Sequence, residues 1–474
     1  MKKIVLLHLY FLGIVHLSLA QRNTPAGAAF PFPQNKTYAY GMQPSNVNIA
    51  DVISAYDFWR SNYTENCNGS WRVKADDPNY TFSEGIGYGM LLSAYAADKI
   101  LFDGLWAYYK KFKDSNGLMN WKVQGCNSLN QTGAASDADL DAAVGLYIAD
   151  KQWGSKGLIN YLADCKTLAN TILTYEVNPN SWNLFNGNTW GINSECFNPG
   201  YFSPAYYKLF KNISGNANWD KVYARAYTVL NANSNSVTGL VSNWCDANGN
   251  AGTCNGPLEY GWDACRNPWR LAIDVLWNGS PAGMSILNKQ TAFWQSKGAS
   301  QVSGPMPLGG GSGLYHTGAF IATWGAGAMG CTRNFANQSH VNAMYTENVN
   351  NPPTATGSYF SGTLRVLGLF VQSGNFYLPE TVVTSDENDF SELELPALFP
   401  NPAKDKIVLN LSSLQGPAAI EIRDFMGSVR IKTTLLHEEM VSDKAISLAG
   451  LGSGLYILNI KANSNSWIKR FVKE

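Results

Sequence analysis

Most of the chain repeats one pattern, in which a loop rich in Gly, Asn, Pro or Trp precedes a stretch whose apolar residues recur every three or four positions. That spacing is typical of amphipathic helices, and strand-like runs are scarce between residues 25 and 378. The predicted helices are 83–100, 105–113, 137–151, 157–175, 203–211, 219–233, 270–276, 281–296, 317–329, 334–345 and 359–373. Helices joined by long aromatic-rich loops predict an all-α domain, an α/α barrel whose loops form a cleft at one end.

The composition changes sharply near residue 379. Residues 379–396 contain six acidic residues and no Lys or Arg, which is typical of a solvated linker. Beyond it, residues 406–411, 419–423, 455–461 and 467–472 alternate apolar and polar side chains between Gly and Pro, as half-buried strands do. We therefore predict a helical domain at 21–378, a linker at 379–396 and a small all-β sandwich at 397–474.

The N-terminus has the pattern of an export signal. Lys2 and Lys3 precede an apolar run at residues 4–19, and small residues at 18 and 20 allow cleavage before Gln21. This pattern predicts a secretory signal peptide at residues 1–20. No later segment reaches the ~20 apolar residues that a membrane-spanning helix needs, so no anchor is predicted.

Export would place the eight cysteines in an oxidising compartment, where disulfides form. We expect Cys245 to bond Cys254, because the two flank one short loop. The sequence contains no CxxC pair and no HExxH motif. A metal site is therefore not predicted.

Charge and aromatic content restrict the partners. Lys and Arg number 35, as do Asp and Glu, and no long basic run occurs, which argues against nucleic acid as a partner. Aromatic residues make up 13% of the chain, with 15 Trp and 24 Tyr among many Gly and Asn. Flat apolar faces beside hydrogen-bonding groups are surfaces on which sugar rings stack.

The first of three acidic clusters begins at Ser83, which we interpret as a helix N-cap. Glu84 would then lie in the first turn of an otherwise apolar helix. A carboxyl in apolar surroundings has a raised pKa and can hold a proton near neutral pH, which suits a general acid. The alternative is a surface glutamate favoured by the helix dipole.

The second cluster contains Asp137, Asp139 and Asp141, whose spacing of two prevents all three from sharing one helix face. They fit a helix start at which one caps, one binds a ligand and one faces solvent. Calcium is a weaker alternative, because the EF-hand pattern is absent. The third cluster contains Asp263, which could instead simply pair with Arg266 or Arg270.

Together the clusters predict glycoside hydrolysis. That reaction needs one protonated carboxylic acid for the leaving oxygen and one carboxylate as base or nucleophile. It needs no cofactor, in agreement with the absence of metal and phosphate-binding motifs in the sequence.

The chain resembles glycoside hydrolase family 8 over nearly all of residues 26–376. The matching segments are 82–92 (FSEGIGYGMLL), 117–121 (GLMNW), 134–141 (AASDADLD), 150–153 (DKQW), 190–191 (WG), 198–204 (NPGYFSP), 262–266 (WDACR) and 362–367 (GTLRVL). The resemblance implies an inverting enzyme on an (α/α)6 barrel. The chain departs from the family pattern at packing positions near 142–145, which does not affect the chemistry.

The resemblance also assigns roles to residues. Glu84 is the general acid, Asp263 is the general base as in the cellulase branch, and Asp137 binds and helps to distort the sugar at the cleavage site. The family's chitosanase branch takes its base from an inserted glutamate, so the match at Asp263 argues against that branch. The predicted substrate-binding residues are Trp121, Trp190, Tyr201, Arg266 and Asp139.

The tail resembles the C-terminal sorting domain of the type IX secretion system. The matching segments are 398–403 (LFPNPA), 422–427 (IRDFMG), 451–457 (LGSGLYI) and 469–474 (KRFVKE). This resemblance implies a secreted or cell-surface protein whose tail engages the outer-membrane secretion machinery. A carbohydrate-binding sandwich is the alternative, although the tail contains a single Trp and a single Tyr.

The sequence thus predicts a secreted, monomeric enzyme that cleaves internal β-1,4 bonds of cellulose-type or mixed-linkage glucans. One alternative keeps the family and changes the polymer to xylan, cut internally or from a reducing end. In an exo-acting enzyme, residues 304–316 are where a loop could close the cleft. The other is a non-catalytic glycan-binding protein, which would have no reason to retain Glu84, Asp137 and Asp263 together.

Overall fold

A computed structural model describes residues 27–379 and 397–474, apart from 190–195, 253, 255–256, 354–357, 412–416, 425–427, 437, 439–442 and 463–464. The predicted signal peptide and nearly all of the predicted linker lie outside the described residues. The chain divides into two compact units, Met1–Thr381 and Val382–Glu474.

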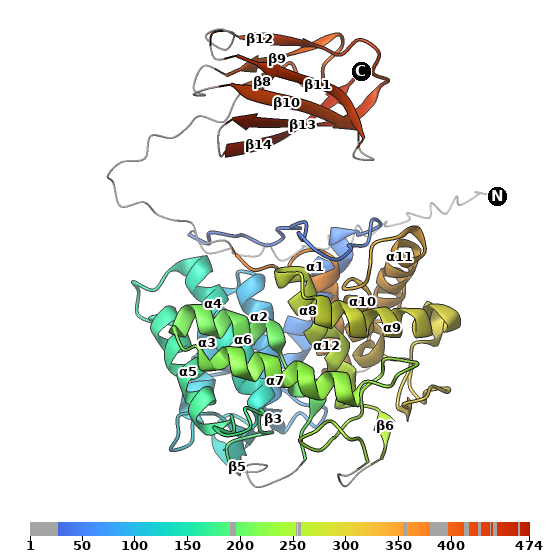
Figure 1. Cartoon of the computed structure of the whole chain (residues 1–474). Helices are drawn as coiled ribbons and strands as arrows, with labels where there is room; N and C mark the ends of the chain where they lie inside the picture. The colour runs from blue at the N-terminus through green and yellow to red at the C-terminus, as the bar shows by residue number, and fades with distance from the viewer. Residues whose placement is uncertain are drawn as a thin grey trace, which may run out of the picture. The chain divides into compact units, whose positions relative to one another are not determined.

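Helices make up most of the first unit (Figure 1). They are α1 (Ile49–Tyr63), α2 (Ser83–Tyr95), α3 (Lys99–Lys111), α4 (Ser136–Trp153), α5 (Tyr161–Tyr175), α6 (Pro204–Ser214), α7 (Asn218–Asn233), α8 (Asn267–Asn278), α9 (Pro281–Lys297), α10 (Gly318–Ala328), α11 (Phe335–Asn350) and α12 (Tyr359–Gln372). The structure confirms that this unit is mostly helical, as predicted.

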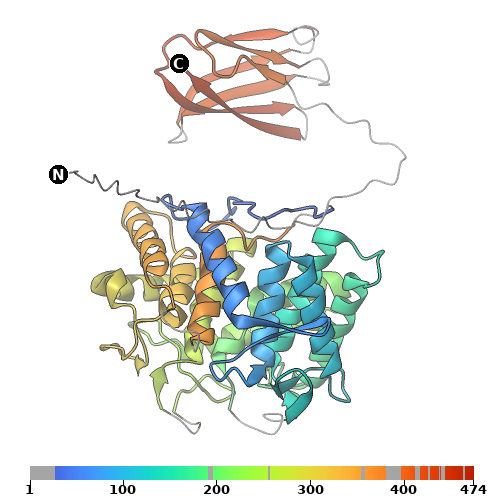
Figure 2. The ribbon, with the colours of Figure 1, turned by 180° about the vertical axis from the view of Figure 1, so that it is seen from behind.

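Apart from α6, the helices alternate in burial along the chain. α2, α4, α8, α10 and α12 are buried almost all round, whereas α1, α3, α5, α7, α9 and α11 each leave one side exposed. Each odd-numbered helix from α3 to α11 packs on the even-numbered helix before or after it. α1 packs on α12, so the first and last helices of the unit lie side by side, as the view from behind shows (Figure 2).

Glycines allow α2 and α4 to approach closely. A Cβ atom at Gly87 would lie 2.7 Å from the Ala138 carbonyl oxygen, and one at Gly145 would lie 3.0 Å from the Met90 Cβ. A larger side chain at either position would force the helices apart. The Gly-rich sequence after Glu84 therefore serves helix packing.

Two helix predictions need correction, and one helix was missed. The predicted helix 83–100 is two helices, because α2 ends at Tyr95 and α3 begins at Lys99, where the Asp98 carboxylate caps the Leu101 N–H. Ser83 is the first residue of α2 and its hydroxyl does not cap the helix; Phe82 holds the N-cap position. α1 was not predicted.

Short strands complete the first unit: β1 (Thr64–Cys67), β2 (Ser70–Val73), β3 (Tyr80–Phe82), β4 (Asn120–Gln124), β5 (Ser128–Ala134), β6 (Glu259–Tyr260) and β7 (Met306–Pro307). β3, β4 and β5 form one antiparallel sheet in that order. None of these strands was predicted, because two to seven residues carry little periodicity.

The predicted Cys245–Cys254 disulfide is wrong. The disulfides join Cys67 to Cys126 and Cys196 to Cys254, while Cys245 keeps a buried thiol. The backbone of Cys245 pairs with that of Phe197, the residue after Cys196. This pairing places the segment of Cys196 beside the loop that carries Cys254. Cys67–Cys126 ties β1 to the turn between β4 and β5.

The second unit contains two antiparallel sheets, ordered β11-β10-β13-β14 and β12-β9-β8. The strands are β8 (Ala397–Phe399), β9 (Lys406–Asn410), β10 (Ala418–Asp424), β11 (Val429–Leu435), β12 (Lys444–Ser447), β13 (Gly454–Ala462) and β14 (Asn465–Lys473). Alternate residues of β9, β10 and β13 enter one shared hydrophobic core. The prediction of an all-β tail is confirmed.

Candidate active site

A cleft of about 950 Å³ opens where the N-terminal ends of α2, α4, α8 and α12 converge. The residues that line it are Asp76, Phe82, Ser83, Glu84, Trp121, Gln131, Thr132, Ala135, Asp137, Thr189, Tyr201, Trp262, Asp263, Arg266, Ser358, Tyr359, Phe360 and Ser361. The cleft is therefore built from segments at the starts of four helices, which are remote from one another in the sequence.

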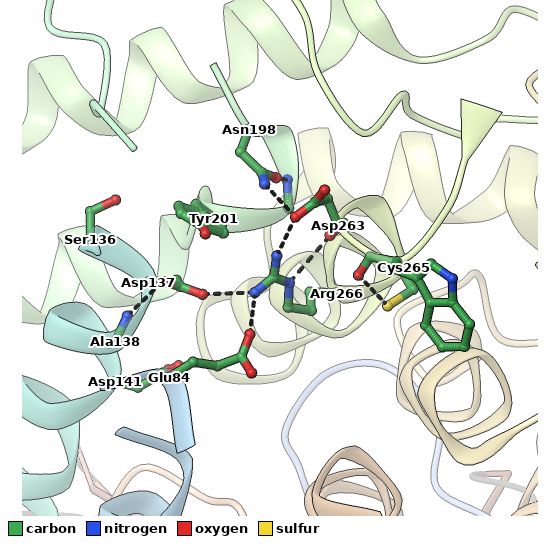
Figure 3. A network of polar contacts seen from close by, with 12 residues as sticks. Glu84, Ser136, Asp137, Ala138, Asp141, Asn198, Tyr201, Asp263, Cys265 and Arg266 are labelled. Atoms are coloured by element: carbon green, nitrogen blue, oxygen red, sulfur yellow. Dashed lines mark hydrogen bonds and ion pairs between the residues drawn. The ribbon is translucent and has the colours of Figure 1, made fainter. Parts of the chain in front are cut away.

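Arg266 joins three carboxyl groups at the floor of this cleft (Figure 3). Its Nη1 donates to Glu84 Oε2 at 2.9 Å and to Asp137 Oδ2 at 2.7 Å. Its Nη2 donates to Asp263 Oδ1 at 3.0 Å. The guanidinium is almost completely buried, and Tyr201 covers it with its ring centroid 4.7 Å away. The three acidic clusters of the sequence therefore meet on one cation.

Glu84 is placed to hold a proton. Burial raises the pKa of Glu84 to about 7; Arg266 acts against this and Asp137 adds to it. Tyr359 Oη donates to Glu84 Oε1 at 2.5 Å, and 20% of the carboxyl side chain remains exposed to the cleft. At neutral pH a large fraction of Glu84 is therefore a carboxylic acid that a ligand in the cleft can reach.

Asp263 has a more open environment than Glu84. Its side chain is 34% exposed, and its Oδ1 accepts hydrogen bonds from Arg266 and from Asn198 Nδ2, the latter at 3.0 Å. Gly200 lies directly below, where a Cβ atom would lie 2.1 Å from the Asp263 carbonyl oxygen. This contact explains why the NPGY segment needs a glycine.

The second acidic cluster differs from its prediction, because all three of its aspartates are buried. Asp137 reaches the cleft, and burial raises its pKa against the effect of Arg266. Asp139 was predicted to bind substrate, but it has no exposed surface, accepts a hydrogen bond from Tyr109 Oη and is not among the lining residues. The structure therefore gives Asp139 no direct contact with a ligand.

Asp141 has a structural role. Its two oxygens accept hydrogen bonds from Arg270 at 2.5 and 2.7 Å in a fully buried, bidentate pair. The pair joins α4 to α8 beneath the cleft. Of the two arginines that were alternative partners of Asp263, Arg266 contacts it, and Arg270 pairs with Asp141 instead.

We expect Asp141→Ala to lower the free energy of unfolding by about 3–5 kcal/mol, because it leaves the buried Arg270 guanidinium without its partner. Urea denaturation followed by Trp fluorescence measures this, since fourteen of the fifteen Trp lie before residue 379. The matched control is Asp220→Ala, which breaks the exposed pair with Lys211 and should cost about 1 kcal/mol or less. Equal losses in the two variants would contradict the prediction.

Aromatic side chains form the walls of the cleft. Trp121, on β4, stacks against Phe82 with ring centroids 5.8 Å apart. Trp262 is 38% exposed and contacts Phe360. Trp190, predicted to stack on sugars, lies outside the described residues.

Sequence reasoning did not identify four site residues: Tyr359, Asn198, Asp76 and the wall residue Trp262. Asn198 and Trp262 lie within segments already matched to the family, so the sequence did indicate that these two segments belong to the site. Tyr359 and Asp76 gave none: the Asp76 carboxylate accepts the Tyr359 backbone N–H at 2.7 Å across 283 positions of sequence.

The sequence model of Glycosyl hydrolases family 8 matches residues 30–374 of this chain. The chain belongs to glycosyl hydrolase family 8. This family 8 member is 35% identical over 416 residues to Endoglucanase A of Acetivibrio thermocellus, a match that covers 84% of each chain. It is 24% identical over 322 residues to the reducing end xylose-releasing exo-oligoxylanase of Halalkalibacterium halodurans, covering 63% of this chain and 81% of that protein.

Solved structures agree with this membership. The apo structure of a β-1,3-1,4-glucanase from Paenibacillus sp. X4 matches the family 8 chain with a TM-score of 0.68 and 30% identity, covering 73% of this chain and 98% of the other. The predicted family resemblance is confirmed.

The tail has its own match. Residues 397–474 fit the Secretion system C-terminal sorting domain, as predicted, so this family 8 enzyme is exported. None of the helices in the described part of the chain is long and apolar enough to cross a membrane.

Proposed function

We propose that this protein is an inverting endo-β-1,4-glucanase that hydrolyses cellulose-type or mixed-linkage β-glucans. The observation that carries the proposal is the set of three carboxyls held on Arg266, one of them with its pKa raised to about 7 and one of them open to the cleft. The names of the relatives at 34–35% identity, all endoglucanases, support the glucan substrate over xylan.

In this mechanism Glu84 is the general acid. It transfers its proton to the glycosidic oxygen as the bond to the anomeric carbon breaks. The carboxylate that remains is stabilised by the Arg266 guanidinium and by the Tyr359 hydroxyl, which already contact it. Asp137 holds the sugar at the cleavage site.

Asp263 is the general base. It removes a proton from a water molecule whose oxygen attacks the anomeric carbon from the opposite face, so the configuration inverts. Glu84 and Asp263 contact different nitrogens of one guanidinium, at 2.9 and 3.0 Å. A planar spacer of this kind supports the separation of roughly 6.5–9.5 Å that leaves room for the water.

The proposal includes the architecture around the site. The alternation of buried and half-exposed helices, closed by contact of α12 with α1 and α2, supports an (α/α)6 barrel. The two sheets that share one core support a β-sandwich at 397–474. Residues 1–20 are assigned to a signal peptide, 21–378 to the catalytic domain and 379–396 to a linker. We propose a monomer that acts on glucan and engages the secretion machinery through its tail.

Hydrolysis by residues 21–474 tests the function on mixed-linkage β-glucan, carboxymethyl cellulose, xylan and chitosan, with released reducing ends and viscosity followed together. Glu84→Gln is the control for contaminating activity. A rapid fall in viscosity on the glucans, absent in the control, is the expected result. Activity on xylan alone would change the proposed substrate from glucan to xylan. Binding without hydrolysis of any polymer would favour a glycan-binding protein.

The acid predicts a pH dependence. Glu84 must be protonated to act and its pKa is about 7, so kcat/KM on neutral glucan should fall as the pH rises through 7. The Tyr359 hydrogen bond lowers that pKa, so Tyr359→Phe should move the alkaline limb to higher pH. Initial rates across the pH range measure the alkaline limb of the unaltered enzyme and of Tyr359→Phe. An unchanged alkaline limb in Tyr359→Phe would show that another group controls it.

A further inference from the structure

An exposed aromatic surface continues from the cleft onto the loop 304–316. Trp262 lines the cleft beside Asp263, and its ring centroid lies 5.4 Å from that of Tyr315. Tyr315 is 50% exposed and the preceding residue, Leu314, is 77% exposed, yet neither lines the cleft itself. The apolar surface therefore begins inside the cleft and ends outside it.

The backbone that carries Tyr315 is fixed. Gly304 and Tyr315 exchange two backbone hydrogen bonds, at 3.1 and 2.8 Å. The ring of the next residue, His316, is held by the Val302 carbonyl at 2.6 Å and by Glu347 of α11 at 2.9 Å. A side chain at Gly304 would strike the Phe320 ring, with a Cβ–Cε1 distance of 2.2 Å. A ligand that meets Tyr315 therefore pays little for ordering the loop.

Position and chemistry indicate what this surface binds. Single exposed apolar residues are common and need no explanation, but this group continues the wall of a cleft built for a polymer. A β-1,4-linked glucose unit has equatorial hydroxyls and presents C–H groups on its two faces. Half-exposed Tyr and Trp offer a flat apolar face together with a polar edge, which matches such a ring.

We propose that Tyr315, together with Leu314, forms an additional subsite that binds a glucose unit of the same glucan chain after it passes Trp262. The inference rests on the proposed glucanase function and deepens it. In this arrangement the loop 304–316 extends the open cleft instead of closing it, so the enzyme gains affinity from longer substrates and still accepts internal bonds.

The test compares cello-oligosaccharides from the tetraose to the heptaose as substrates of residues 21–474. Tyr315→Ala should lower kcat/KM by about tenfold on the longest substrate, with a loss that diminishes as the chain shortens. Tyr315→Trp should retain the dependence on chain length. The matched control is Tyr175→Ala, at an exposed tyrosine on α5 outside the cleft, which should behave as the unaltered enzyme at every length.

Two outcomes would overturn the proposed subsite and leave the glucanase function standing. One is a loss of equal size at every chain length, which would mean that Tyr315 only supports Trp262; the other is no loss on the heptaose. Binding of the heptaose to Glu84→Gln, with and without Tyr315→Ala, separates affinity from turnover by calorimetry. An unaltered enzyme that cleaves none of the oligosaccharides would instead overturn the glucanase function, and the subsite with it.

Discussion

Glu84→Gln is expected to lower kcat on mixed-linkage β-glucan by about 10²–10⁴-fold, the contribution of a general acid. The amide has nearly the shape of the carboxyl, and its oxygen can still accept a hydrogen bond from Arg266 or Tyr359. Substrate binding should therefore persist, and KM should change little. Steady-state kinetics on the polymer, with heptaose binding by calorimetry, measure the two effects separately.

The leaving group provides the control. In a dinitrophenyl cellobioside, the leaving group is a dinitrophenolate, which departs without needing a proton. Glu84→Gln should therefore lose much less activity on this substrate than on the glucan. A variant that loses equally on both substrates would have been damaged in another way, and Glu84 would no longer be supported as the acid.

Asp263→Asn is expected to lower kcat by a similar factor, about 10²–10⁴, because the amide cannot take the proton of the attacking water. Water must be activated whatever group leaves, so this variant should lose as much on the dinitrophenyl substrate as on the glucan. That pattern distinguishes the base from the acid. NMR of the first product of the unaltered enzyme should show the inverted anomer.

Retention of most activity by Asp263→Asn would refute the assignment of the base. Asp137 would then be the next carboxyl to consider, although it is almost completely buried and tied to the same Arg266 nitrogen as Glu84. Retention of configuration in the product would contradict the inverting mechanism itself.

The helices could be predicted because their apolar periodicity is local. Their ends were less certain where two helices adjoin: α2 and α3 are separated by three residues, and only the cap at Asp98 marks the break. The sheet of β3, β4 and β5 was missed because its strands are short, because irregularities shift the register between β4 and β5, and because β3 pairs with β4 across a long stretch of sequence.

The carboxyls of the site could be found from their neighbours in sequence and from the family resemblance. Their arrangement could not, since Arg266 contacts Glu84 across 182 positions. Asp139 was predicted to bind substrate but is buried and does not line the cleft, and the sequence could not show this. Nearly every residue of α4 is buried, so periodicity does not tell which of its faces meets the cleft and which meets α5.

The lining of the cleft has a consequence for the polymers it admits. Among the described residues that line it, Asp76, Glu84, Asp137 and Asp263 carry carboxyl groups and Arg266 carries a guanidinium, so the net charge of these residues is negative even where Glu84 holds a proton. A concave site with a net charge focuses its field and repels ligands whose charge has the same sign, within a Debye length of about 10 Å at 0.1 M salt. Hydrolysis of carboxymethyl cellulose should therefore quicken as ionic strength rises, while that of neutral mixed-linkage glucan stays constant. Electrostatics alone would then direct the enzyme to undecorated glucans and away from acidic polysaccharides in the same mixture.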